Sequence, residues 1–96
     1  MQNYFLNRGY DSVVMLEALA QDIIEIHAKD GNVGELSGAL LGTGDSRFYE
    51  QVEVIKKIQY TGWIHLENYY DQQPLSNTGD PFELLKKDIT ILKEAF

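Results

Sequence analysis

The chain has 96 residues, 44% of them hydrophobic and 11% aromatic, which is the size and composition of one small folded domain. Its 15 acidic and 8 basic side chains give a formal net charge of −7, which argues against nucleic acid as a partner, and it has no cysteine for disulfides or thiolate metal sites. No apolar run approaches the ~20 residues that span a bilayer, so we expect a cytoplasmic protein that binds no membrane.

The first predicted elements are a helix and a strand that follows it directly. Asp11 or Ser12 caps the helix, because either side chain can accept a hydrogen bond from its first turn. The apolar face of this helix consists of Val13, Leu16 and Ala20. The strand covers residues 23–28, and side chains alternate across it. One face therefore carries Ile24, Ile26 and Ala28, and the other carries Glu25, His27 and Lys29.

A long glycine-rich segment, residues 31–44, separates this strand from the second predicted helix. It matches neither a phosphate-binding P-loop nor a dinucleotide-binding fingerprint, so we expect a flexible connection, with a phosphate cradle of backbone N–H groups as the alternative. Asp45 or Ser46 caps the helix, and Lys56 and Lys57 lie in its last turn, where cations favour the helix dipole. The apolar face of this helix consists of Phe48, Val52 and Ile55.

The second predicted strand covers residues 63–67 and again has two different faces. Ile64 and Leu66 share one face, and the other carries Trp63, His65 and Glu67. The last helix has a clear start signal, because Asp80 can cap it, Pro81 suits its first turn and Glu83 can complete a capping box. Its predicted apolar stripe consists of Leu85, Ile89, Leu92 and Phe96.

The resulting order is α-β-α-β-α, which indicates an α/β fold with two parallel strands joined by a right-handed crossover. The turns that lead into the strands are short, and the segments that follow the strands are long. In parallel α/β folds, functional residues gather at the carboxyl ends of the strands. We therefore expect the functional residues near the long loops.

His27 and Glu67 each lie near the carboxyl end of a predicted strand, on the polar face. If the strands are parallel neighbours, an imidazole nitrogen and a carboxylate oxygen come together, and both are good ligands for zinc, manganese or a similar divalent ion. The alternative is an amphipathic two-stranded sheet whose polar side faces water.

The chain also resembles a known family over nearly its whole length. It is similar to the carboxyl-terminal part of the xylose isomerase-like sugar phosphate isomerases and epimerases. The matching motifs, in chain order, are residues 27–30 (HAKD), residues 42–45 (GTGD), Phe48, residues 60–63 (YTGW) and Glu67. The segments at residues 3–11 and 80–96 resemble the preceding loop and the closing helix of that family.

The resemblance implies part of a (β/α)8 TIM barrel, namely its last two β/α units, as one partial domain over residues 1–96. Family members hold a divalent metal, such as Mn, Mg, Co or Zn, with two Glu, one Asp and one His. They use it to polarise a sugar while acid-base groups move a proton. His27 and Glu67 match two of these metal ligands, and Glu67 is also the expected catalytic residue. Lys29 and Asn3 are the expected substrate contacts, and the substrate class would be a small sugar or sugar phosphate.

A complete barrel of this kind takes ~250 residues, so we expect 96 residues to hold only two of the four ligands. The leading expectation is a carboxyl-terminal fragment that is inactive alone. Two parallel strands also leave sheet edges unpaired. We therefore expect a homo-oligomer or a complementing chain, and the alternatives are a small self-assembling or partner-binding protein and an enzyme completed by a second chain.

Overall fold

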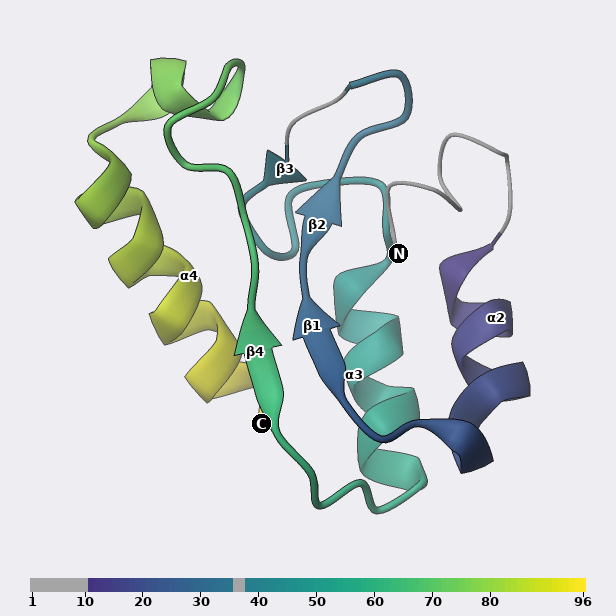
Figure 1. The fold of residues 1–96 in the computed structure, drawn as a ribbon. Helices are drawn as coiled ribbons and strands as arrows, with labels where there is room; N and C mark the ends of the chain where they lie inside the picture. The colour runs from purple at the N-terminus through teal and green to yellow at the C-terminus, as the bar shows by residue number, and fades with distance from the viewer. Residues whose placement is uncertain (1–10, 36–37) are drawn as a thin grey trace.

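The computed structural model describes residues 11–35 and 38–96, so Asn3 and the segment around it lie outside the described residues. In the described part, three α-helices and a two-stranded parallel sheet form a mixed α/β fold (Figure 1). The helices are α2 (Ser12–Leu19), α3 (Phe48–Lys57) and α4 (Pro81–Ala95). The parallel strands are β1 (Ile26–Ala28) and β4 (Ile64–Leu66), and a short antiparallel pair is formed by β2 (Asp30–Gly31) and β3 (Gly38–Ala39).

The expected α-β-α-β-α order and the parallel pairing are confirmed. β1 and β4 run in the same direction, with His27 opposite His65, and α3 provides the crossover between them (Figure 1). Both strands are shorter than predicted. A 3₁₀ turn at Ala20–Asp22 precedes β1, and pairing begins only where the Ile26 N–H donates to the Trp63 carbonyl (3.3 Å). Ile24 was expected on the aliphatic face of the strand, but it precedes the paired region and is 92% exposed.

The core lies between the aliphatic face of the parallel sheet and the helices. Its buried centre consists of Ala28, Leu41, Phe48 and Val52. Partly buried side chains from β4 and α4 pack against this centre, namely Ile64, Leu66, Ile91, Leu92 and Ala95. The predicted apolar face of α3 is therefore correct, and burial of aliphatic and aromatic surface holds the sheet to its helices.

The glycine-rich segment is organised by Asp30, whose side chain is fully buried. Its carboxylate accepts hydrogen bonds from the backbone N–H groups of Gly31, Gly42, Gly44 and Ser46, and from the Ser46 hydroxyl (2.6–3.2 Å). The N–H groups that were considered as a phosphate cradle therefore serve a carboxylate of the protein itself. A side chain at Gly44 would collide with this carboxylate, and its Cβ would lie 2.5 Å from the Gly31 carbonyl oxygen.

Two of the three predicted helix caps are correct. Asp11 accepts hydrogen bonds from the first turn of α2, and Asp80 does the same for α4, where Pro81 occupies the first turn. The prediction for α3 is wrong, because its N-cap is Arg47 in a left-handed conformation, without a side-chain cap. Ser46 is engaged by Asp30, and Asp45 accepts a hydrogen bond from the Val33 N–H at 3.0 Å, so neither side chain serves the helix.

The predicted apolar stripe of α4 is only partly correct. Ile89 and Phe96 are 38% and 47% exposed, whereas Leu84 is 1% exposed and Asp88 is fully buried. The Asp88 carboxylate accepts hydrogen bonds from the Leu41 N–H, the Asn68 amide and the Tyr70 hydroxyl (2.8–3.1 Å). A hydrogen-bonded carboxylate therefore occupies the centre of the buried face, and the helix is rotated relative to the stripe expected from apolar residues alone.

Candidate functional site

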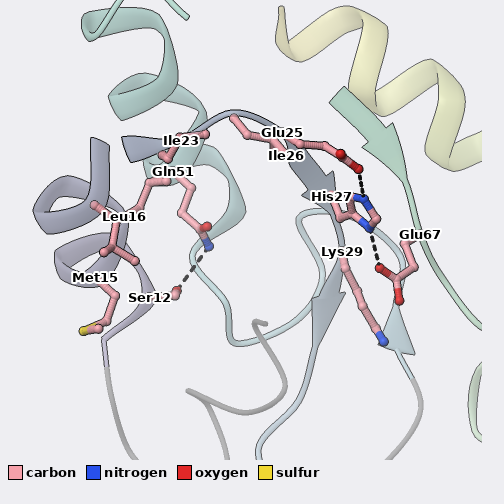
Figure 2. A pocket seen from close by; sticks show the side chains of 11 residues that line it. Ser12, Met15, Leu16, Ile23, Glu25, Ile26, His27, Lys29, Gln51 and Glu67 are labelled. Carbon is pink, nitrogen blue, oxygen red and sulfur yellow. Dashed lines mark hydrogen bonds and ion pairs between the residues drawn. The ribbon is translucent and has the colours of Figure 1, made fainter. Parts of the chain in front are cut away.

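The face of the β1–β4 sheet opposite the core carries four titratable side chains in contact. The parallel register sets His27 beside His65, with ring centroids 5.2 Å apart. Each nitrogen of His27 faces a carboxylate, since Nδ1 lies 2.9 Å from Glu67 Oε2 and Nε2 lies 2.5 Å from Glu25 Oε1. His65 Nε2 lies 3.6 Å from the same Glu25 oxygen. Figure 2 shows His27 between the two carboxylates.

The contacts of His27 shift the pKa values of all three groups. The hydrogen bond to Glu25, followed by the one to Glu67, raises the pKa of His27 above its ordinary value of 6.5. The same contacts lower the pKa values of Glu25 and Glu67, in each case mainly through the hydrogen bond with His27. About half of the His27 side chain is exposed, so water screens these interactions. The cluster is accessible to small ligands and ions.

Lys29 follows His27 by two residues and lies next to Glu67 (Figure 2). The residue is buried, with 7% exposure, and its ammonium group lies 4.0 Å from the centre of the Tyr69 ring. This cation–π contact holds the side chain at the carboxyl end of the sheet. The predicted substrate contact is thus beside the predicted ligand Glu67, whereas Asn3 lies outside the described residues.

A cavity of about 240 Å³ lies between α2 and this polar face. Aliphatic groups line one side of it, including Met15, Leu16, Leu19 and Ile23. The other side includes polar groups in β1 or directly flanking β1 and β4, namely Glu25, His27, Lys29 and Glu67 (Figure 2). Apolar walls with a few convergent polar groups are typical of small-molecule sites.

Among residues 11–35 and 38–96, two overlapping sets of side-chain atoms could ligate a metal ion. The His27 Nδ1 and Glu67 Oε2 atoms are 2.9 Å apart, slightly less than the separation of about 3.3 Å expected for neighbouring ligands of one tetrahedral ion. The donor chemistry of this pair therefore fits the divalent metal implied by the family resemblance. In the second set, one ligand atom each from Glu25, His27 and His65 lies within 4.8 Å of the others.

The sequence predicted His27 and Glu67 as metal ligands, but it did not identify Glu25 and His65 as members of a ligand set. The signal was present in the alternation of both strands, which places Glu25 with His27 and His65 with Glu67. The sequence did not specify the register in which the two strands pair. Only the pairing of His27 with His65 shows that these side chains reach one another.

No helix in the described part of the chain is long and apolar enough to cross a membrane. Comparisons with protein-family models, with curated proteins and with solved structures found no match for this chain. The polar face of the β1–β4 sheet, with the cavity beside it, is therefore the feature from which its function is inferred.

Proposed function

We propose that this chain supplies part of the active site of a metal-dependent sugar phosphate isomerase or epimerase of the xylose isomerase-like TIM-barrel type. The observation that carries this proposal is the contact of 2.9 Å between His27 Nδ1 and Glu67 Oε2 at the carboxyl ends of adjacent parallel strands. Imidazole and carboxylate together suit Mn²⁺, Co²⁺, Zn²⁺ or, less well, Mg²⁺. A bound ion would supply Lewis-acid polarisation of a sugar carbonyl or hydroxyl.

The roles of the neighbouring side chains follow from their positions. Glu67 is the carboxylate that would hold the ion and orient a substrate hydroxyl. Lys29, with its ammonium group beside Glu67 and over the Tyr69 ring, is suited to bind an anionic or hydroxylated substrate. The resemblance implies two further ligands, an Asp and a Glu, so catalysis requires strands in addition to β1 and β4.

The test is a titration of metal-free protein with Mn²⁺ by isothermal calorimetry. We expect micromolar binding that His27→Ala and Glu67→Ala each abolish, because the pair acts as one chelate. Glu53→Ala, an exposed substitution on α3, is the matched control and should bind Mn²⁺ like the wild type. Wild-type affinity in both site variants would contradict the proposal.

Substrate binding has a separate readout. Paramagnetic Mn²⁺ at this site should broaden the ³¹P signal of an added ketose phosphate, and Lys29→Met should weaken that effect while Mn²⁺ binding persists. Broadening that is equal in the wild type and in Lys29→Met would remove Lys29 from the substrate site.

A second candidate function, assembly with another chain, is favoured by the open edges of the sheet. Ile26 and Ala28 direct their backbone groups toward β4, so those of Glu25, His27 and Lys29 point to the other edge of β1. That edge has no strand partner among residues 11–35 and 38–96, and Ile24, which leads into β1, is 92% exposed. A strand from a second copy or from a complementing chain would pair with the free backbone N–H and C=O groups of this edge. Light scattering that shows a stable monomer at micromolar concentration would contradict self-association.

A further inference from the structure

His27 has two nitrogens with different surroundings, and they suggest different roles. Nδ1 faces Glu67 alone, whereas Nε2 faces a space that Glu25 and His65 also border. The separation of 2.5 Å between His27 Nε2 and the Glu25 oxygen is that of a hydrogen bond, in which Nε2–H donates to the carboxylate. In the metal-free chain this proton joins the two atoms, and a metal ion that binds both atoms would replace it.

We propose that Glu25, His27 and His65 form a binding site for Zn²⁺ or a similar transition-metal ion that is complete within this chain. The site uses Nε2 of His27, and an ion there is an alternative to one on the His27–Glu67 pair of the proposed function, because Nδ1 then carries a proton. It does not depend on that function, because it needs only groups on β1, β4 and the residue that leads into β1.

The three ligand atoms lie close enough together for small side-chain rotations to bring them to zinc-binding distances. With bonds of about 2.0 Å, neighbouring ligand atoms of a tetrahedral site lie about 3.3 Å apart. The Glu25 oxygen lies 2.5 Å from His27 Nε2 and 3.6 Å from His65 Nε2, and all three ligand atoms lie within 4.8 Å of one another. These side chains are about half exposed, so small rotations can bring them to coordination distance.

Glu67 has a supporting role at this site. A ligating histidine usually donates its other ring N–H to a carboxylate, which fixes the tautomer and the ring orientation. Here the Nδ1–H of His27 would donate to Glu67 Oε2 at 2.9 Å, which leaves Nε2 free to bind the ion. This arrangement is a second observation in favour of metal binding, because it orients the ring toward Glu25 and His65.

The ligand set also predicts which ions bind. Two imidazoles and one carboxylate suit Zn²⁺, Co²⁺ or Ni²⁺, whereas Mg²⁺ and Ca²⁺ prefer oxygen ligands alone. Three protein ligands leave at least one coordination position for water or a small oxygen ligand. The cavity of about 240 Å³, which Glu25 and His27 help to line, provides space for such a ligand.

The test is a titration of the untagged, metal-stripped chain with Zn²⁺ in competition with a chromophoric chelator. We expect one Zn²⁺ per chain with micromolar or tighter affinity and no competition from millimolar Mg²⁺. Glu25→Ala and His65→Ala should each weaken binding at least tenfold. Glu67→Gln should change it less than tenfold, because the amide oxygen still accepts the Nδ1–H. Glu83→Ala, on the exposed face of α4, is the control and should match the wild type.

Several results would overturn this site. They are wild-type affinity in Glu25→Ala or His65→Ala, absence of zinc binding, or half a zinc per chain with a doubled mass. If Glu67→Gln weakens zinc binding at least tenfold and Glu25→Ala leaves it unchanged, the ion binds to the His27–Glu67 pair. That result contradicts this inference and supports the proposed function.

Because His27 and His65 are the two histidines of the chain, a ¹H–¹⁵N imidazole spectrum gives an independent readout. Both ring systems should shift when Zn²⁺ is added. A His65 ring that does not respond would contradict the proposal.

Discussion

His27 is the residue on which the polar face depends, because it connects the two strands through its side chain. Its ring contacts the carboxylate of Glu25, which directly precedes β1, and the carboxylate of Glu67, which directly follows β4. Both contacts are exposed, so they contribute modestly to stability and are screened by salt. Their main effect is on the protonation of His27 and on the orientation of its ring.

In the metal-free chain, His27 should titrate above its ordinary pKa of 6.5, because protonation lets both nitrogens donate to carboxylates. The measurement is an NMR titration of its Hε1 signal in the presence of a chelator. The substitutions Glu25→Gln and Glu67→Gln should each lower the midpoint, as should high salt. A wild-type midpoint at or below 6.5 would contradict the described contacts.

The sign of the linked stability change follows from the same shifts. A raised pKa of His27 in the folded state gives stability that is fully present below 6.5 and is lost as the pH rises through the folded value. Lowered pKa values of Glu25 and Glu67 give stability that is present above 4.5 and is lost as the pH falls. The stability lost in His27→Gln should therefore be larger at about pH 5.5 than at about pH 9, as measured by urea denaturation.

Asp30 differs from His27 because its side chain is fully buried and accepts hydrogen bonds from several backbone N–H groups of the glycine-rich loop. Asp30→Ala would leave several buried N–H groups without an acceptor, so we expect it to lower the free energy of unfolding by about 3 kcal/mol or more. Urea denaturation measures this change. Asp45→Ala, which removes one exposed hydrogen bond from the Val33 N–H, should cost about 1 kcal/mol or less. Equal effects of the two substitutions would contradict the assigned role of Asp30.

At the scale of elements, α4 shows how a buried polar residue changes the orientation of a helix. Periodicity of apolar residues placed Ile89 in the core, but the helix instead buries Asp88, which joins it to Leu41, Asn68 and Tyr70. Burial, followed by the contact with Asp88, raises the pKa of the Tyr70 hydroxyl, which therefore stays protonated and donates to the carboxylate. The network fixes α4 against the loops that follow both strands.

The two orientations of α4 predict opposite results for two leucine-sized side chains. Leu84 is 1% exposed, so Leu84→Ala should cost about 3 kcal/mol of unfolding free energy through lost burial and a cavity. Ile89 is 38% exposed, so Ile89→Ala should cost about 1 kcal/mol or less. Chemical denaturation of the two variants decides between the orientations, and the reverse order would favour the stripe expected from periodicity.

At the scale of the whole molecule, the described part of the chain pairs β1 only with β4. An unpaired strand edge beside exposed apolar groups is a site for association with another strand. Trp63, the single tryptophan of the chain, directly precedes β4 and is 80% exposed, so its fluorescence reports on the amino end of the sheet.

If an assembly covers the edge of β1 and the adjoining amino end of the sheet, quenching of Trp63 fluorescence by iodide should decrease as the protein concentration rises. The mass from light scattering should increase above 11.0 kDa over the same range. Ile24→Lys should reduce both changes, because it places a charge beside the open edge. Lys56→Ala, an exposed substitution on α3, is the control. A constant mass of 11.0 kDa with constant quenching would contradict self-association.

Local sequence patterns were enough to predict the α/β order, the parallel strands, two helix caps and the apolar face of α3. They also placed His27 and Glu67 on one face near the strand ends, where the two side chains meet. The register that joins Glu25 and His65 to His27, the capping of α3 and the orientation of α4 became visible only in the folded chain. Asp30, Ser46 and Asp88 are satisfied by partners distant in the chain, and no local pattern specifies which distant partner a buried polar group will meet.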